Sequence, residues 1–213
     1  MKFKNILSFS LIAIVLSSCL GDKKGANIAE MNDNSFVNKN FKGNLLNYSK
    51  DMSACETMST SDIASLYNVS ESMIVFEDIS KSDRRAPNSL PTCMFYLKDG
   101  ASDFEWLRGS MNVQPEIGKD ETAYDVAKGA GNSEEWEEAW AINKSISKSS
   151  QWIKNIGMAA LWNDKNKELK IKFKGYTLNV YPLKNRLNKA EVSKNRDYKS
   201  IAIAMAKASG FIN

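Results

Sequence analysis

Residues 157–183 read GMAALWNDKNKELKIKFKGYTLNVYPL and have the clearest pattern in the chain. Hydrophobic and polar residues alternate over 169–174 and again over 176–181, which is the two-residue period of strands with one buried face. The polar residues 163–166 and the single Gly175 separate the apolar runs and predict tight turns. We therefore expect three short antiparallel strands here, with a solvated face that carries Lys170, Lys172 and Lys174.

Helix and strand patterns alternate on both sides of this stretch. Helices are expected over about 60–67, after the acidic start at 132–135, and over 195–209 at the end of the chain. Runs of β-forming residues predict further strands at 72–76, 92–97 and 104–113. This order predicts an α+β domain at 51–213, in which helices cover one face of a largely antiparallel sheet. A faint internal duplication, helix plus three strands, is an additional hypothesis.

The composition excludes several classes of protein. The chain has 213 residues, with no histidine and three cysteines, and its formal net charge is +4. Without histidine the chain has no Ser-His-Asp or Cys-His triad, no His-containing zinc site and no usual haem ligand. The nearly balanced charge argues against a nucleic-acid partner, which normally requires a strongly basic surface.

The N-terminus has the order of a secretory signal. Lys2 and Lys4 precede a short apolar run that ends in Leu16-Ser17-Ser18-Cys19. At about 11 residues the run is shorter than the roughly 20 apolar residues of a membrane-spanning helix. The cysteine after Leu-Ser-Ser resembles the lipobox of bacterial lipoproteins, which implies a signal peptide at 1–18 and lipid attachment at Cys19. A plain cleaved signal is the alternative.

Two further features concern the chain directly after Cys19. Leu20 and Gly21, and the basic Lys23 and Lys24, resemble lipoproteins that are held in the periplasmic leaflet of the outer membrane. Residues 19–50 are rich in polar side chains without a sustained period, which is typical of a flexible tether. Phe36, Phe41 and Leu45-Leu46 leave open the alternative that part of this segment lies against the domain as an edge segment.

Cys55 and Cys93 remain once Cys19 is assigned to the lipid. Exported compartments are oxidising, so a disulfide between them is expected. A loop of this length predicts a stabilisation of about 4 kcal/mol. No Cys-x-x-Cys spacing is present, so the sequence gives no sign of a dithiol redox centre.

Several of these elements together resemble a family of uncharacterised exported lipoproteins. The resemblance covers about residues 55–208 and rests on Cys55, Cys93-Met-Phe-Tyr, the run 156–162, the run 175–180 and the final Ala-rich helix. It implies a cysteine-bridged half followed by a β-hairpin half. It implies no enzymatic activity, and Met158 and Ala160 stand where more polar residues are common.

No convincing catalytic set emerges from the motifs. Ser145 and Lys148 match SxxK, but the companion motifs of penicillin-recognising enzymes are missing. The acidic group Glu134, Glu135, Glu137 and Glu138 favours an ordinary helix start over a carboxylate pair for hydrolysis. No metal-binding motif is found, and we expect no cofactor and no metal.

Two features are candidate contact surfaces. Trp136 and Trp140 share one face of a predicted helix, where a buried core is the usual position and an exposed aromatic pair the alternative. Arg84 and Arg85, beside Pro87, offer forked donors for carboxylates or phosphates in a polar loop.

The sequence therefore favours a binding protein over an enzyme. The leading hypothesis is a lipid-anchored binding module in the bacterial cell envelope, attached to the outer membrane through its lipid and facing the periplasm. Its ligand is a protein or a small molecule that the sequence does not identify. The alternatives are an immunity or inhibitor protein that neutralises a toxic enzyme, and a histidine-free hydrolase that uses carboxylates.

Overall fold

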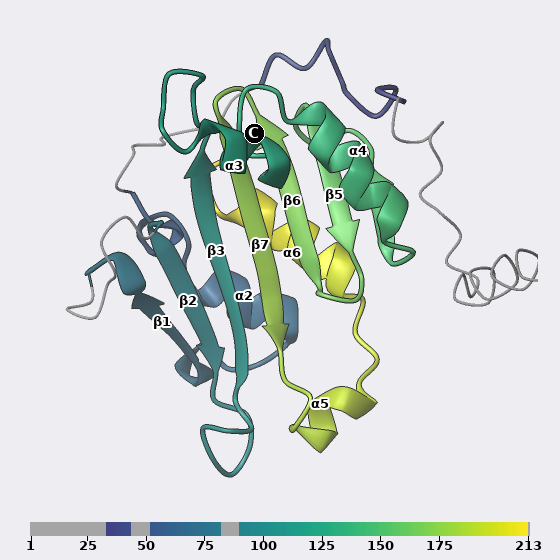
Figure 1. Ribbon diagram of the computed structural model, residues 1–213. Helices are drawn as coiled ribbons and strands as arrows, with labels where there is room; N and C mark the ends of the chain where they lie inside the picture. Colours follow the sequence, from purple (N-terminus) through teal and green to yellow (C-terminus); the bar gives the residue numbers. More distant parts are fainter. Residues whose placement is uncertain (1–32, 44–51, 82–89, 213) are drawn as a thin grey trace, which may run out of the picture.

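A computed structural model describes residues 33–43, 52–81 and 90–212. Within these ranges seven strands form one antiparallel sheet in the order β1-β2-β3-β7-β6-β5-β4 (Figure 1). The strands are β1 (Ile74–Asp78), β2 (Thr92–Leu97), β3 (Leu107–Pro115), β4 (Ser150–Ile153), β5 (Ala159–Asn163), β6 (Glu168–Phe173) and β7 (Tyr176–Lys184). The fold is α+β, as the sequence predicts, and β3 and β7 join its two halves.

Helices lie on both faces of the sheet (Figure 1). The back face is covered by α2 (Thr60–Tyr67) and α6 (Tyr198–Ala208), which pack on each other. On the front, α4 (Glu137–Ile146) packs on β4, and α3 (Tyr124–Ala130) lies beside it. A fifth helix, α5 (Lys189–Ser193), follows β7 below the sheet. The expected cover of one face by helices is therefore present on the back, and α4 adds partial cover on the front.

The main core lies between the back of the sheet and helices α2 and α6. Strand residues of alternating position point into it, as the two-residue period predicts. Their buried side chains include Phe95, Met111, Leu169, Ile171, Leu178 and Val180. From the helices come Ile63 and Tyr67 on α2 and Ala202 and Met205 on α6. The hydrophobic alternation read from residues 169–180 thus identifies the back face of β6 and β7.

A smaller core lies on the front beneath α4. Trp136 and Trp140 are each only 2% exposed and pack on Ala159 and Leu161 of β5. The indole of Trp140 donates a hydrogen bond of 3.0 Å to the carbonyl of Gly131. Because both rings are core, they offer no contact surface to a partner.

The covered front also changes the expected position of Lys172. This side chain is 0% exposed, and its ammonium forms an ion pair with Glu116 and lies 5.7 Å from the ring centroid of Trp136. Burial lowers the pKa of Lys172. The prediction that Lys172 faces solvent is therefore wrong, because Trp136 and α4 cover this part of β6.

Other differences from the sequence prediction concern the ends of elements and short segments. The acidic start at 132–135 precedes α4 but lies outside it, because Asn132 and Ser133 pair with Ile117 and stay extended. The third strand begins at Leu107, three residues later than expected. The pattern also missed β4, α3 and α5, whose lengths are four, seven and five residues.

The arrangement of the strands agrees with an internal duplication, but the arrangement of the helices does not. β1–β3 and β5–β7 are both antiparallel meanders, and they meet through β3 and β7. The helix before the first meander, α2, lies on the back, whereas the helix before the second, α4, lies on the front (Figure 1). A two-fold axis that exchanges the meanders would keep both helices on one face.

Part of the expected tether packs on the domain. Phe36 stacks on Trp152 with ring centroids 3.9 Å apart, and Phe41 meets Phe173 edge-on at 5.9 Å. The amide of Asn38 donates to the carbonyl of Met158 at 2.7 Å. For residues 33–43 the structure therefore has the alternative arrangement, a segment laid against the sheet edge. The signal peptide, Cys19 and the rest of the tether lie outside the described residues.

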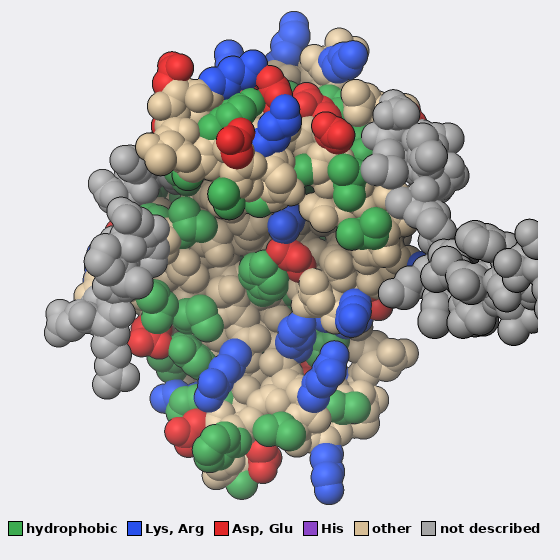
Figure 2. All heavy atoms as spheres, in the orientation of Figure 1, with side chains coloured by type: hydrophobic (Ala, Val, Ile, Leu, Met, Phe, Trp, Pro, Cys, Tyr) green, Lys and Arg blue, Asp and Glu red, His purple; other side chains and the backbone are tan. Residues whose placement is uncertain are grey.

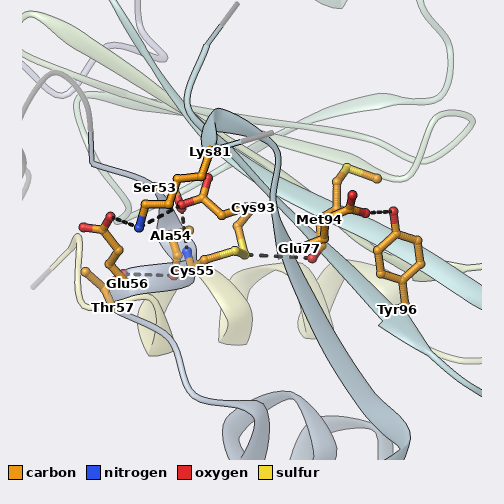
Figure 3. Close-up of a disulfide and its surroundings, with 11 residues drawn as sticks. Ser53, Ala54, Cys55, Glu56, Thr57, Glu77, Lys81, Cys93, Met94 and Tyr96 are labelled. Atoms are coloured by element: carbon orange, nitrogen blue, oxygen red, sulfur yellow. Dashed lines mark hydrogen bonds and ion pairs between the residues drawn. A yellow bond between two sulfur atoms is a disulfide. The ribbon is translucent and has the colours of Figure 1, made fainter. Parts of the chain in front are cut away.

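The expected disulfide between Cys55 and Cys93 is present (Figure 3). It joins the short 3₁₀ helix Ala54–Glu56 to β2, and the two Cα atoms are 5.1 Å apart. Cys93 is fully buried in the main core. The bond thus fixes the segment before α2 to the sheet.

A buried ion pair holds α5 against α2 and α6. The Glu191 carboxylate on α5 is 0% exposed and accepts hydrogen bonds from Arg196 Nε and from the Tyr198 hydroxyl, the latter at 3.1 Å. The Arg196 guanidinium also lies 4.8 Å from the ring centroid of Tyr67. In turn the Tyr67 hydroxyl donates to the carbonyl of Leu183 at 2.9 Å. This cluster connects three helices to the end of β7.

Candidate functional site

On the front of the sheet, no helix of the described residues covers the lower parts of β3 and β7, although Thr177 and Asn179 are themselves buried (Figure 1). The side chains that point forward here are polar, because the hydrophobic positions of both strands face the main core. They include Ser110, Asn112 and Gln114 on β3 and Thr177 and Asn179 on β7. Asn179 donates to Asn112 across the strands at 2.9 Å. The hollowed centre of this face is visible in Figure 2.

A cavity of about 730 Å³ lies at the lower end of this open area, where β7 ends. We call it the basic pocket. Four cations line it: Arg108, Lys165, Lys184 and Arg186. Three aromatic side chains line it as well: Phe104, Trp106 and Tyr181. No carboxylate lines this pocket, and Figure 2 shows Lys and Arg side chains gathered in the lower half of the face.

Two asparagines build the wall of the basic pocket. Asn185, directly after β7, donates to the carbonyls of Phe104 and Trp106 at 2.5 and 2.9 Å. Asn188 is buried and donates to the carbonyls of Asp99 and Glu105 at 2.9 and 3.2 Å. These bonds fix the loop between β2 and β3 against the chain that follows β7, so the pocket is preformed.

Arg108 and Lys184 are direct neighbours across β3 and β7. The Arg108 guanidinium extends over the ring of Tyr96 on β2, 5.9 Å from the ring centroid, and the Lys184 ammonium extends towards Asn166 before β6. Burial lowers the pKa of Lys184, and the positive charges of Arg186 and Lys167 lower it further. Lys184 and Arg186 thus concentrate positive charge where β7 ends, at the basic pocket.

Two of the four cations donate hydrogen bonds to backbone carbonyls. Lys184 donates to the carbonyl of Asn166, and Arg108 donates to the carbonyl of Asp103 at 3.2 Å. Among the described residues, none of the four cations forms an ion pair with a carboxylate. Nearby lysines do form such pairs: Lys167 with Asp164 at 2.8 Å, and Lys170 with Glu168 at 3.7 Å. The four cations of the basic pocket thus differ from these two neighbouring lysines, which have carboxylate partners.

The aromatic side chains give the pocket an apolar side. Phe104 is 78% exposed and Leu187 is 66% exposed, both at the rim. Tyr181 is half-buried, and its hydroxyl donates to Glu168. Exposed apolar side chains beside cations are typical of surfaces that bind another molecule.

One member of the predicted acidic group, Glu135, forms two surface ion pairs. Glu135 contacts Lys119 at 2.7 Å and Lys128 at 2.6 Å, and these hydrogen bonds lower its pKa to about 2. More broadly, four surface cavities of the described residues are each lined by at most one carboxylate. In the same ranges no group of three Cys, Asp or Glu side chains is placed to hold a metal ion.

These ion pairs predict a small acid-sensitive contribution to stability. Because the folded-state pKa of Glu135 lies below its usual value near 4.5, the contribution is present above that pH and disappears as the pH falls towards 2. Glu135→Gln should therefore lose less stability than the wild type between pH 5 and pH 2.5, in thermal unfolding at low salt. The matched control Glu134→Gln, next in sequence, should follow the wild type. Equal acid sensitivity in all three proteins would contradict the prediction.

Comparisons with known proteins add no family. Neither a protein-family model, nor a curated protein, nor a solved structure matches the chain. The resemblance to exported lipoproteins therefore stays a prediction from the sequence. Within the described residues no helix is both long and apolar enough to cross a membrane.

The basic pocket is lined by residues other than Trp136 and Trp140. Trp136 and Trp140 lie in the front core, and Arg84 and Arg85 lie outside the described residues. The pattern missed Arg108, Lys184 and Arg186. A signal for them existed, since Lys184-Asn185-Arg186 follows directly after a predicted strand, but the pairing of β3 with β7 was needed to place Arg108 beside it.

Proposed function

We propose that the protein is a lipid-anchored binding module of the bacterial cell envelope. The observation that carries this proposal is the preformed pocket on the front face, whose four cations have no carboxylate partner among the described residues. The N-terminal pattern that ends at Cys19 supports the anchor. Hydrolysis by carboxylates needs two of them in one site, and each of four cavities is lined by at most one. This favours binding over hydrolysis.

The anchor predicts that Cys19→Ser releases the protein from membranes. The sulfur of Cys19 is the atom that would accept the diacylglycerol. Two or three acyl chains, at about 0.8 kcal/mol per buried methylene, hold a protein firmly on a membrane. Wild-type protein should sediment with the membranes and partition into detergent, whereas the Cys19→Ser variant should stay in the aqueous fraction. A Cys19→Ser protein that still fractionates with lipid-modified proteins would contradict the anchor.

The binding role is tested by site-directed photo-cross-linking in cells. A photo-cross-linking amino acid at Leu187, on the exposed rim of the basic pocket, should give a discrete adduct. The matched control is the same amino acid at Lys207, an exposed position of α6 on the other side of the sheet. No adduct at position 187, or the same adduct at both positions, would contradict a binding role for the open face. An adduct with a toxic enzyme would favour the inhibitor alternative.

A further inference from the structure

Four cations line the basic pocket, and they are the strongest unexplained feature of the described residues. Arg108, Lys165, Lys184 and Arg186 come from three separate parts of the chain, the start of β3, the turn before β6 and the end of β7. Their charge is not balanced by any carboxylate that lines the pocket. By contrast, the lysines just outside it are paired with Asp164 and Glu168.

The cross-strand pair Arg108 and Lys184 places two cations at this end of the front face. The Arg108 guanidinium lies over the ring of Tyr96 and the Lys184 ammonium donates to the carbonyl of Asn166, so among the described residues neither cation has an anionic partner. An acidic group bound in the pocket would give both cations that partner. Arg186 and Lys165 supply charge for a second acidic group, and Arg forks suit carboxylate and phosphate oxygens.

The size and the apolar side of the pocket limit the ligand further. About 730 Å³ is within the usual range of small-molecule sites. The rings of Phe104 and Trp106 provide flat surfaces beside the cations, which suit a ring or another flat body of the ligand. The concave shape and the half-buried Lys184 favour a molecule that enters the pocket over a flat lipid surface.

We propose that the basic pocket binds a small polyanionic ligand, one that carries at least two carboxylate or phosphate groups on a body with a flat apolar face. This inference rests on the proposed binding function and names the chemical class of the ligand. Arg108 and Lys184 hold one acidic group, Arg186 and Lys165 a second, and the aromatic rim contacts the body.

Titration calorimetry at physiological salt with two matched probe pairs tests the proposal. Trigalacturonate and its fully methyl-esterified form have the same rings, with and without carboxylate charge. Thymidine 3′,5′-bisphosphate and thymidine, which share a flat base, make the same comparison for phosphate. The full-length protein, solubilised in neutral detergent, should bind at least one anionic probe saturably and neither neutral one, and the arm that binds distinguishes carboxylate from phosphate.

Matched variants locate the binding. Arg108→Gln/Arg186→Gln, at two exposed pocket positions, should weaken binding of the anionic probe at least tenfold. Lys174→Gln/Lys207→Gln removes the same charge from exposed positions outside the pocket and should change the affinity less than twofold. Circular dichroism of both variants verifies that they are folded.

Three results would overturn the proposal. One is equal binding of a neutral and an anionic probe, and another is equal weakening in the two double variants. The third is binding only to vesicles of phosphatidylglycerol and phosphatidylcholine, with no saturable binding of either anionic probe. If the probes fail while the adduct at position 187 still forms in cells, the ligand class is wrong and the binding module stands. If the probes bind but no adduct forms, the proposed cellular function fails instead.

Discussion

Loss of the disulfide should lower the free energy of unfolding by about 4 kcal/mol. Cys55 and Cys93 close a loop of 38 positions, and the cross-link restricts the unfolded chain. Cys93 is also fully buried, so its replacement leaves a small gap in the main core. The variant to measure is Cys55→Ala/Cys93→Ala, by urea denaturation of the purified protein.

Two controls make this result interpretable. Cys19→Ser retains the disulfide and should keep the wild-type stability of the domain. Cys55→Ala alone should lose nearly as much stability as the double variant, because either substitution opens the loop. A loss of less than about 1 kcal/mol in the double variant would show that the cross-link contributes little to this fold.

Arg196→Met should destabilise the protein by about 3–5 kcal/mol. The substitution keeps much of the side-chain volume but leaves the fully buried carboxylate of Glu191 without its closest cation. Tyr198 and the more distant Lys194, at 3.5 Å, are then the remaining partners of that carboxylate. The contact of Arg196 with the ring of Tyr67 is lost as well.

The origin of this loss can be separated by a second substitution. Arg196→Met/Glu191→Gln removes the buried charge together with its partner and should recover part of the stability. Lys194→Met tests the exposed partner of the same carboxylate and should cost less than about 1 kcal/mol. If Lys194→Met costs as much as Arg196→Met in urea denaturation, the buried pair is not the origin of the effect.

The sequence pattern predicts those parts of the fold whose signal is local. Leu169, Ile171, Leu178 and Val180 alternate within two neighbouring strands, so their common face follows directly from the two-residue period. The disulfide follows from the two cysteines that remain once Cys19 is assigned to the predicted lipid anchor. The helix over 60–67 follows from an N-cap residue and the apolar spacing of Ile63, Leu66 and Tyr67, and the structure adds a capping box in which Ser59 and Asp62 exchange hydrogen bonds.

Features that depend on what covers a strand could not be predicted. The alternation places Lys172 on the polar face of β6, but the pattern contains no information that α4 covers this position. The basic pocket could not be predicted either, because it depends on which strands pair. Arg108 and Lys184 become neighbours only because β3 pairs with β7, and Asn185 then fixes the loop that carries Phe104 and Trp106.

The central claim is that the open half of the front face is the ligand site. Amide chemical-shift mapping, during titration with the anionic probe that binds in calorimetry, tests it most directly. We predict saturable shifts concentrated in residues 104–108, 165–166 and 181–187, around the basic pocket. Shifts concentrated on α6 at the back of the sheet, or spread evenly over the exposed lysines of the molecule, would contradict the claim.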